Sequence, residues 1–440
     1  MPPRFRRYLL LYLAGVAAIV VLIWLILHPQ TPPISAPPSP APDPVTPLQE
    51  PPKAEISLLA KPPDWSVLDQ FQNSITREDF ERLLTHVFTT SDSWMKFIRF
   101  EGNSVVFLGA GPDLSEEMTV HFAEPGSMPK PPRPWKATED LPPYPAGKPL
   151  AGLHIAIDPG HIGGKWAKME ERWFVVGDGT PVMEGDMTLA VAKLAKPQLE
   201  KLGAKVTLVR DQTEPVTSIR PEALMELAEK TSGNPDPLTV RKLAERLFYR
   251  TAEIRARAEI VNDIIKPDLV LCLHFNGEEW GDPNQPALID RTHFHVLLNG
   301  AYNSGEVALG DQRFAMLQKI FQGIHREEAL VGKTVADEFA RISGLPAYSY
   351  PANSLNARAM PSSPYLWARN LLANRLYDCP VIFMEPYVMN STHDYARIQA
   401  GDYEGLREVD GKLQPSIFRE YAGALVEGLS KHYASHRSQQ

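Results

Sequence analysis

From residue 150 onward the chain alternates between short runs of apolar residues and longer segments with helical periodicity. The apolar runs are nearly continuous, so a strand formed by any of them would be buried on both of its faces. We expect strands at 152–158, 205–209, 268–274, 292–298 and 380–385, and helices at 186–202, 240–265 and 417–433. Strands and helices in this alternation predict an α/β fold, with a mostly parallel twisted sheet flanked by helices.

The composition supports a globular protein with a sizeable core. Of its 440 residues, 43% are apolar and 22% are charged, which excludes global disorder. The formal net charge is −8, whereas a domain that binds nucleic acid is usually basic, so we expect no nucleic-acid partner. About half of the 42 prolines gather in two stretches, which we interpret as linkers.

The N-terminal segment predicts a membrane anchor. Residues 8–27 form an uncharged apolar run that is long enough, as a helix, to cross the hydrocarbon region of a bilayer. Arg4, Arg6 and Arg7 precede the run, and no Lys or Arg follows it until Lys53. Because positive residues stay on the cytoplasmic side, the N-terminus is expected in the cytoplasm and the rest of the chain outside.

A cleaved signal peptide is the alternative for the same segment. Its apolar region would be shorter, and a pair of small residues would follow at a cleavage site. The nearest such pair, Ser35 and Ala36, is followed by Pro37. These features favour an uncleaved single-pass protein of the cytoplasmic membrane, in which residues 1–28 are a cytoplasmic tip and a transmembrane anchor. The α/β domain is then expected on the periplasmic or cell-wall side.

The rest of the chain divides by composition into four parts. Residues 29–63 combine proline with small polar residues, a composition that forms an extended linker. Residues 64–122 contain a helix start at Thr76 and two short strand patterns, which predict a small α+β accessory module. A second proline-rich linker is predicted at 123–149, and the α/β domain at 150–434.

Four polar side chains stand at the ends of the predicted elements. His161 follows the first strand after a Pro-Gly turn, and Glu184 lies just before the first helix. His274 and Glu385 each end a predicted strand. Because sites in parallel sheets gather beyond the carboxyl ends of the strands, we expect these side chains to meet at one rim.

Two imidazoles and one carboxylate with an open fourth position are typical ligands of a catalytic zinc ion. Such an ion lowers the pKa of bound water to about 7 and polarises a carbonyl group. The further carboxylate of Glu385 can take the proton of the water and pass it to a leaving nitrogen. The sequence thus indicates metal-assisted hydrolysis at this rim.

Each of the four residues also has an ordinary structural explanation. A lone loop histidine such as His161 is often a surface residue, and His274 fits a core histidine bonded to the backbone. Glu385 fits a structural ion pair, and Glu184 stabilises the start of a helix without any ligand. The functional interpretation depends on all four residues occurring in this order at element ends.

Two further pairs of residues can bind metal or form a bridge. His293 and His295 alternate on a predicted strand, so both rings face one side, and a His-x-His pair can bind metal. No acidic residue of obvious spacing accompanies them. Cys272 and Cys379 are too few for a four-thiolate zinc site or a disulfide framework, and we expect free buried thiols.

Five sequence blocks around these residues resemble the zinc-dependent N-acetylmuramoyl-L-alanine amidases of the amidase_3 family, over about residues 150–433. The blocks are IAIDPGH at 155–161, EGDMTL at 184–189, GAKVTLVR at 203–210, RAEIVN at 257–262 with LHFN at 273–276, and PVIFME at 380–385 with Asn390. The specificity of the resemblance comes from the ordered set of blocks.

The resemblance implies that His161, Glu184 and His274 hold one Zn²⁺ ion per chain. It implies that Glu385 is the catalytic acid/base. The reaction would cleave the amide between the lactyl group of N-acetylmuramic acid and L-alanine of the stem peptide, with peptidoglycan as the partner and a protein activator left open. The alternatives are another zinc amidohydrolase or carboxypeptidase on the same scaffold, and a non-catalytic wall-binding regulator.

The sequence departs from the family pattern near the ligands. Ile162 follows the first histidine, where the family usually has glycine, and Pro386 follows Glu385 where Gly-Phe is usual. The interval before Glu184 is longer than usual and contains Glu170 and Glu171. We prefer Glu184 as the ligand because Asp-x-Thr-Leu follows it.

Residues 214–245 and 326–365 also depart from the family pattern, because they look like insertions. We expect these two segments to shape or cover the cleft.

Overall fold

The computed structural model describes residues 55–110, 114–127 and 129–440. The predicted transmembrane helix and most of the first predicted linker lie outside these residues. Among the described residues, no helix combines the length and the apolar composition that crossing a membrane requires. The anchor, its orientation and the cellular location therefore stay predictions.

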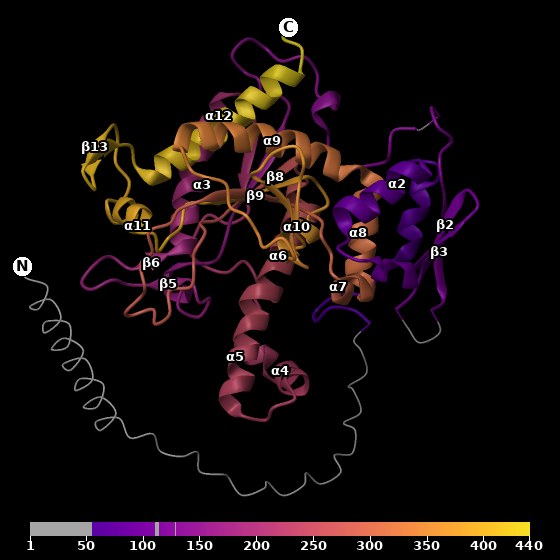
Figure 1. Ribbon diagram of the computed structural model, residues 1–440, viewed down its shortest axis with the longest axis horizontal. Coiled ribbons are helices and arrows are strands. Elements are labelled where there is room, and N and C mark those ends of the chain that lie inside the picture. The colour runs from indigo at the N-terminus through magenta and orange to yellow at the C-terminus, as the bar shows by residue number, and fades with distance from the viewer. Residues whose placement is uncertain (1–54, 111–113, 128) are drawn as a thin grey trace, which may run out of the picture. The chain divides into compact units, whose positions relative to one another are not determined.

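The centre of the fold is a seven-stranded mixed sheet (Figure 1). In spatial order its strands are β10 (Arg358–Ala359), β11 (Leu366–Ala368), β9 (Phe294–Leu298), β12 (Val381–Pro386), β8 (Leu269–Leu273), β4 (His154–Pro159) and β7 (Lys205–Leu208). β12, β8, β4 and β7 run parallel to one another. β9 and β11 are parallel to each other, but β9 is antiparallel to β12 and β10 is antiparallel to β11. The expected parallel order thus holds only for the part of the sheet that carries the predicted ligands, because an apolar run predicts burial and not direction.

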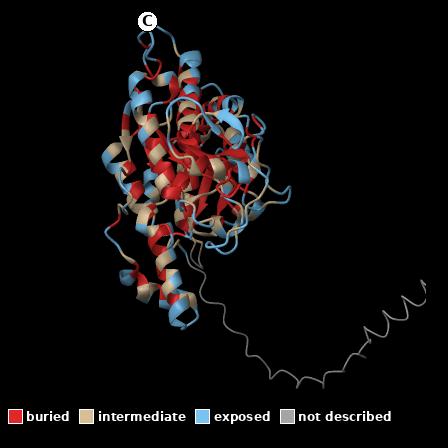
Figure 2. Cartoon of the chain, turned by 90° about the vertical axis from the view of Figure 1, so that its left-hand side faces the viewer, coloured by how far each residue is buried: buried red, intermediate tan, exposed pale blue. Residues whose placement is uncertain are grey.

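Helices cover both faces of the sheet, which explains why its strands are apolar on both sides. Ile155 and Ile157 of β4 belong to a core shared with α3 (Glu184–Lys201), α9 (Ile324–Ser343) and α12 (Ile417–His436). Ala156, between them, faces the opposite core, to which α6 (Glu253–Glu259) and α10 (Leu372–Leu376) contribute. Figure 2 shows buried residues concentrated in the sheet and in the helices beside it.

The predicted helices are present with shifted ends. α3 starts at Glu184 and continues through Pro197. The stretch predicted at 240–265 is made of consecutive segments, α5 (Pro237–Leu247), the π-helical turn η7 (Phe248–Ala252), α6 and a second π-helical turn, η8 (Ile260–Ile265). The remaining elements of the domain are short: β5 (Trp173–Phe174), β6 (Val182–Met183), η5 (Gly164–Trp166), η6 (Pro221–Leu224), α4 (Met225–Ser232), α7 (Ser304–Ala308), α11 (Thr392–Gln399), β13 (Arg407–Val409) and β14 (Lys412–Gln414).

α9 corrects one expectation from the sequence. Most of it belongs to the segment 326–365, which we expected to shape or cover the cleft, yet it packs deep in the core. At Gly332 the helix approaches Leu298 of β9 and Ile382 of β12 so closely that an added Cβ would lie 3.3 and 3.6 Å from their methyl groups. This helix supports the sheet, and its periodic apolar face was overlooked in the sequence.

Residues 64–122 form a three-stranded antiparallel sheet with short helices. Its elements are η1 (Trp65–Phe71), α2 (Arg77–Leu83), η2 (Leu84–Phe88), η3 (Asp92–Lys96), β1 (Ile98–Glu101), β2 (Ser104–Leu108) and β3 (Glu116–His121). Thr76 caps α2, as predicted, by accepting a hydrogen bond from the Asp79 amide. Phe71 stacks 5.5 Å from Phe321 of α8 (Gly310–Gln322), so the two sheets share one hydrophobic core. The predicted domain boundaries stay predictions.

The proline-rich stretch 123–149 makes buried contacts with the α/β domain. Trp135 donates its indole N–H to Gln322 of α8. Thr138, in the turn η4 (Thr138–Asp140), donates its amide to Glu327 of α9 over 2.9 Å. These contacts attach part of the predicted linker to the helical layer.

The cysteine prediction is confirmed. Cys272 of β8 and Cys379 before β12 are both buried and both free. Burial raises the pKa of each thiol above its usual value, which keeps both of them protonated and unreactive.

Candidate metal centre and catalytic cleft

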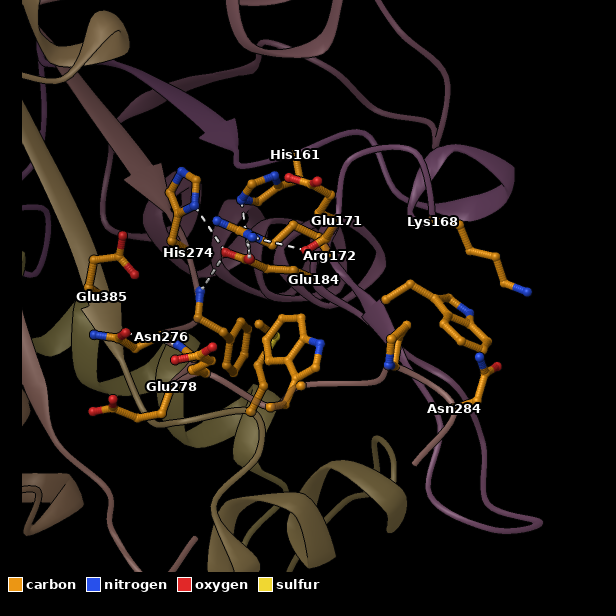
Figure 3. Close-up of a pocket in the computed structure, with 18 of the residues that line it drawn as sticks. His161, Lys168, Glu171, Arg172, Glu184, His274, Asn276, Glu278, Asn284 and Glu385 are labelled. Atoms are coloured by element: carbon orange, nitrogen blue, oxygen red, sulfur yellow. Dashed lines mark hydrogen bonds and ion pairs between the residues drawn. The ribbon is translucent and has the colours of Figure 1, made fainter. Parts of the chain in front are cut away.

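His161, Glu184 and His274 meet where β4 and β8 end and α3 begins (Figure 3). Nε2 of His161 lies 3.1 Å from Oε2 of Glu184, and Nδ1 of His274 lies 3.0 Å from Oε1 of Glu184. One donor atom from each residue lies within 4.8 Å of the other two. The Glu184 side chain is only 2% exposed, while the two imidazoles are partly exposed. No other group of this kind occurs in the described residues.

Gly160 makes room for this arrangement. A Cβ at Gly160 would lie 2.3 Å from Cε1 of His274, a separation that no side chain tolerates. The next residue, His161, has φ of 60°, in the left-handed region that non-glycine residues rarely adopt. The strained backbone aims the His161 ring at Glu184, and such strain is typical of functional sites.

Two buried arginines hold the strained turn in place. Arg257 donates to the His161 carbonyl over 2.7 Å and pairs with Asp158 of β4 over 2.8 Å. Burial lowers the pKa of Arg257, but Asp158 and Glu253 outweigh it and keep the pKa above its ordinary value. Arg210 donates to the carbonyl of Gly160 over 3.1 Å. The guanidinium groups thus fix the backbone beneath the ligands.

Glu170 and Glu171, the other two glutamates between His161 and Glu184, make different contacts. Glu170 accepts hydrogen bonds from the amides of Ile162 and Gly163 and lies 3.7 Å from Nδ1 of His161. Glu171 pairs with arginines on the η7 side of the cleft. The structure therefore brings Glu184 into the three-residue group, and it assigns Glu170 to the far nitrogen of His161, a contact that the sequence analysis missed.

The charges around the group favour a bound cation. Burial disfavours the charged imidazole, but the carboxylates of Glu184 and Glu170 outweigh it and raise the pKa of His161 to about 9. Burial also favours the neutral acid at Glu184, yet the imidazoles of His161 and His274 hold the pKa of Glu184 well below its usual value. Two imidazoles facing one buried carboxylate, with further carboxylates around them, are a donor set that fits zinc.

Glu385 lies beside the group at the end of β12. The strands align it with His274, whose amide donates to the Met384 carbonyl over 3.0 Å. Both residues line one cleft of about 900 Å³, and Figure 3 shows Glu385 on the opposite side of the ligands from Lys168. Burial raises the pKa of Glu385, which suits a group that exchanges protons near neutral pH.

The cleft also has walls that the sequence analysis did not identify. Residues 214–245, expected to shape it, contribute none of its lining. Arg172, whose Nε lies 3.2 Å from Oε2 of Glu184, comes from the long interval after His161. The other newly identified lining residues include Trp173, Trp280, Arg369 and Met389. The unusual length of the interval between His161 and Glu184 was the signal in the sequence that this segment contributes residues to the cleft.

His293 and His295 do not form a metal site with a third ligand among the described residues. His293 lies 3.2 Å from Glu278, which also pairs with Arg291. Nε2 of His295 lies 3.2 Å from the Tyr350 hydroxyl, and burial lowers the pKa of His295 to about 3. This neutral, buried ring belongs to an aromatic cluster.

Comparison with known proteins gives one family match. The family model Amidase_3, described as N-acetylmuramoyl-L-alanine amidase, matches residues 155–406. The matched region contains all four predicted site residues, from His161 to Glu385. No curated protein sequence matches the chain.

Similar solved structures include three amidases. The N-acetylmuramyl-L-alanine amidase Ami1 from Mycobacterium abscessus is 19% identical, with 64% of this chain and 99% of that chain covered and a TM-score of 0.35. The CwlD amidase from Clostridioides difficile, in complex with the GerS lipoprotein, is 12% identical, with 64% and 100% covered and a TM-score of 0.35. The N-acetylmuramoyl-L-alanine amidase AmiC2 of Nostoc punctiforme is 16% identical, with 64% and 97% covered and a TM-score of 0.33. These similarities are low, and the family match carries the assignment.

Proposed function

Because the chain belongs to the N-acetylmuramoyl-L-alanine amidase family Amidase_3, we propose that it cleaves peptidoglycan with one zinc ion held by His161, Glu184 and His274. The bond cleaved is the amide between the lactyl group of N-acetylmuramic acid and L-alanine of the stem peptide. Glu385 is the acid/base. The observation that carries the proposal is the convergence of these four side chains on one cleft.

The zinc ion, when bound, supplies a Lewis acid for the amide carbonyl and acidifies water. Glu385 accepts a proton from the attacking water as the oxygen bonds to the carbonyl carbon. It then delivers that proton to the nitrogen of L-alanine as the carbon–nitrogen bond breaks. The products are the lactyl carboxylate and a peptide with a free amino group.

Neighbouring groups orient the reacting ones. Glu170 lies beside Nδ1 of His161, so it favours the tautomer that keeps the proton on Nδ1 and leaves Nε2 free as a donor to metal. Arg172 lies against Glu184 and holds the carboxylate in place. The amide of Phe275 also donates to Oε1 of Glu184, over 3.2 Å.

For the location, we propose a single-pass protein of the cytoplasmic membrane with the α/β domain outside. The apolar run at 8–27 and the arginines before it support this orientation. An extracytoplasmic domain on a proline-rich spacer has access to the cell wall, where its substrate lies.

The test is digestion of purified muropeptides by the full-length protein, followed by mass spectrometry of the fragments. Release of intact stem peptides with N-terminal L-alanine is expected, together with loss of activity on chelation and recovery with added Zn²⁺. New termini within the stem peptide would show a carboxypeptidase or another amidohydrolase. Binding to peptidoglycan without any turnover would show a wall-binding regulator.

A further inference from the structure

The cleft extends to both sides of the predicted ligands, and its two sides differ in chemistry. In Figure 3, Lys168 and Asn284 lie on one side of His161 and His274, and Glu385 lies on the other. Trp173 lies on the first side, because Lys168 lies against its ring. Trp280 and Arg369 also line the cleft, and Arg369 lies near Glu385. The substrate of an amidase is also two-sided, because a sugar lies on one side of the scissile bond and a peptide on the other.

Trp280 offers a preformed aromatic surface. Its ring centroid lies 5.1 Å from that of the buried Phe174, which supports it from below. The loop that carries it is fixed, because its carbonyl accepts from the amide of Ala287 over 2.8 Å and Asn390 accepts from the amide of Glu278 over 3.0 Å. A partly exposed indole that is held in this way loses little entropy when a ligand stacks on it.

Trp173 extends the same surface. β5 pairs with β6, and the amide of Val175 donates to the carbonyl of Pro283 over 2.9 Å, so the two tryptophan-bearing segments are tied together. Nζ of Lys168 lies 4.1 Å from the centroid of the Trp173 ring. The indoles present π faces to the C–H groups of a sugar ring, while Lys168 and Asn284 can bond hydroxyl and acetyl oxygens.

The opposite side carries the guanidinium of Arg369 beside the carboxylate of Glu385. Arg369 is partly buried and donates to the Tyr350 hydroxyl over 3.0 Å. Within the described part of the chain, no carboxylate lies within 4.0 Å of its guanidinium nitrogens. A guanidinium that lines a cleft and forms no close salt bridge can bind a ligand carboxylate, and a stem peptide carries free carboxylates whereas the muramic acid carboxyl is consumed in the amide.

We propose that the substrate lies across the cleft in one direction, with the glycan strand on Trp173 and Trp280 and a stem-peptide carboxylate on Arg369. The inference rests on the proposed function, because the scissile amide then lies between these two contacts, at the three ligands.

The experiment measures the binding of two separate probes by isothermal titration to the full-length protein with Glu385→Gln, which stops turnover. The probes are peptide-free glycan strands and the free stem peptide. In this background, Trp173→Ala is expected to weaken the binding of glycan strands about tenfold and to leave the binding of the peptide unchanged. Arg369→Met is expected to weaken the binding of the peptide about tenfold and to leave the binding of the glycan strands unchanged.

Matched controls separate these effects from general damage. Trp173→Phe keeps an aromatic face and should restore most of the glycan affinity. Trp166→Ala removes a tryptophan of the same segment that packs on Phe248 and bonds Glu214, outside the cleft lining, and should change neither affinity. Arg326→Met removes an exposed arginine that pairs with Glu139, and should also be silent.

Three outcomes contradict the orientation: reversed effects, equal effects on both probes, or no effect of either variant. Failure of the proposed function is seen separately, because the unmodified protein would then release no stem peptide from peptidoglycan. Turnover by the unmodified protein with unaltered binding by Trp173→Ala would overturn the orientation and leave the amidase activity intact.

Discussion

Two histidine pairs lie at one edge of the sheet, and within the described residues only one of them meets a carboxylate in a group that could hold a metal ion. His161 and His274 follow the ends of β4 and β8, while His293 and His295 stand at the start of β9. The register places His295 directly opposite Glu385, so the pairs are separated by a single strand. Both pairs lie at the same edge of the sheet, but His161 and His274 are partly exposed while His293 and His295 are buried, and their surroundings differ as well.

The difference lies in the groups that face the rings. Carboxylates around His161 raise its pKa to about 9, whereas burial among aromatic rings lowers the pKa of His295 to about 3. Two buried carboxylates face the first pair, whereas the carboxylate at the second pair, that of Glu278, is already paired with Arg291, so the first pair fits a cation better. His-x-His spacing brings two imidazoles together but says nothing about the acid that a metal centre needs.

Removing a ring from each pair gives the largest contrast. His274→Ala is expected to abolish zinc binding and to lower hydrolysis by about 10³-fold or more, because the metal contributes several kcal/mol to the transition state. His293→Asn is expected to keep one zinc per chain. Metal analysis of both purified proteins, with activity on muropeptides, checks the contrast. Zinc lost from the His293 variant and kept in the other would reverse the assignment.

The acid/base is tested next, because Glu385 lies between the pairs. Glu385→Gln is expected to lower kcat by about 10²- to 10³-fold, since proton transfer is lost while the ligands remain. Zinc content should stay at the level of the unmodified protein. The acid/base role requires both that the reaction stops and that zinc is retained. A loss of zinc would mean that Glu385 is a ligand.

Glu170 sharpens the comparison, because it adds a second buried carboxylate beside His161, whereas the carboxylate beside His293, that of Glu278, is already paired with Arg291. Glu170→Gln is expected to weaken zinc binding about 10- to 100-fold, through the orientation and basicity of His161. Competition with a chromogenic chelator measures the affinity. Glu171→Gln is the matched control, because that carboxylate pairs with Arg246 and Arg250 away from the ligands, and it should leave the affinity unchanged.

The smallest effect concerns acid stability. The pKa of His295 is lower in the folded chain than its ordinary value of 6.5. Below pH 6.5 this histidine therefore binds a proton in the unfolded chain but stays neutral in the folded chain. Stability is therefore lost as the pH falls from 6.5 toward 3. For His161 in the metal-free protein the sign is opposite, because its raised pKa favours folding below pH 6.5 and this contribution is lost as the pH rises toward 9.

Replacing His295 by phenylalanine removes the acid-sensitive contribution. Between pH 6.5 and 5 the unmodified protein should lose about 2 kcal/mol more unfolding free energy than His295→Phe, at 1.36 kcal/mol per pH unit. Urea unfolding of both proteins at the two pH values gives the difference. Parallel changes in both proteins would mean that His295 titrates normally.

The sequence predicted the part of the fold whose signals are local. Buried strands, capped helix starts and the order of the sequence blocks can each be recognised from short stretches of sequence. β4, β8, β12 and α3 accordingly appear near their expected positions. The direction of β9 was not predictable, because strand polarity depends on where the chain goes next. α9 was missed because its apolar stripe was read as part of an insertion.

The sequence predicted four side chains that meet in one cleft and missed residues that support them. His161, Glu184, His274 and Glu385 stand at strand or helix ends, where topology alone brings them together. Arg257 acts through contacts with Asp158 and His161, which are nearly a hundred residues away, and a single chain offers no pattern for such contacts. Glu170 lies close to His161 in the sequence, but its contact depends on a turn whose geometry the sequence does not reveal.

Because β9 runs antiparallel to β12, the loop between β8 and β9 can change in sequence while the sheet stays the same. β8 ends and β9 begins at the same edge, so the chain between them stays beside the cleft and never has to return beneath the sheet as the β4–α3–β7 connection does. This connection supplies Asn276, Trp280 and Asn284 to the lining. Its length and sequence can therefore drift without disturbing any strand pair, and we expect relatives adapted to other wall polymers to differ there first.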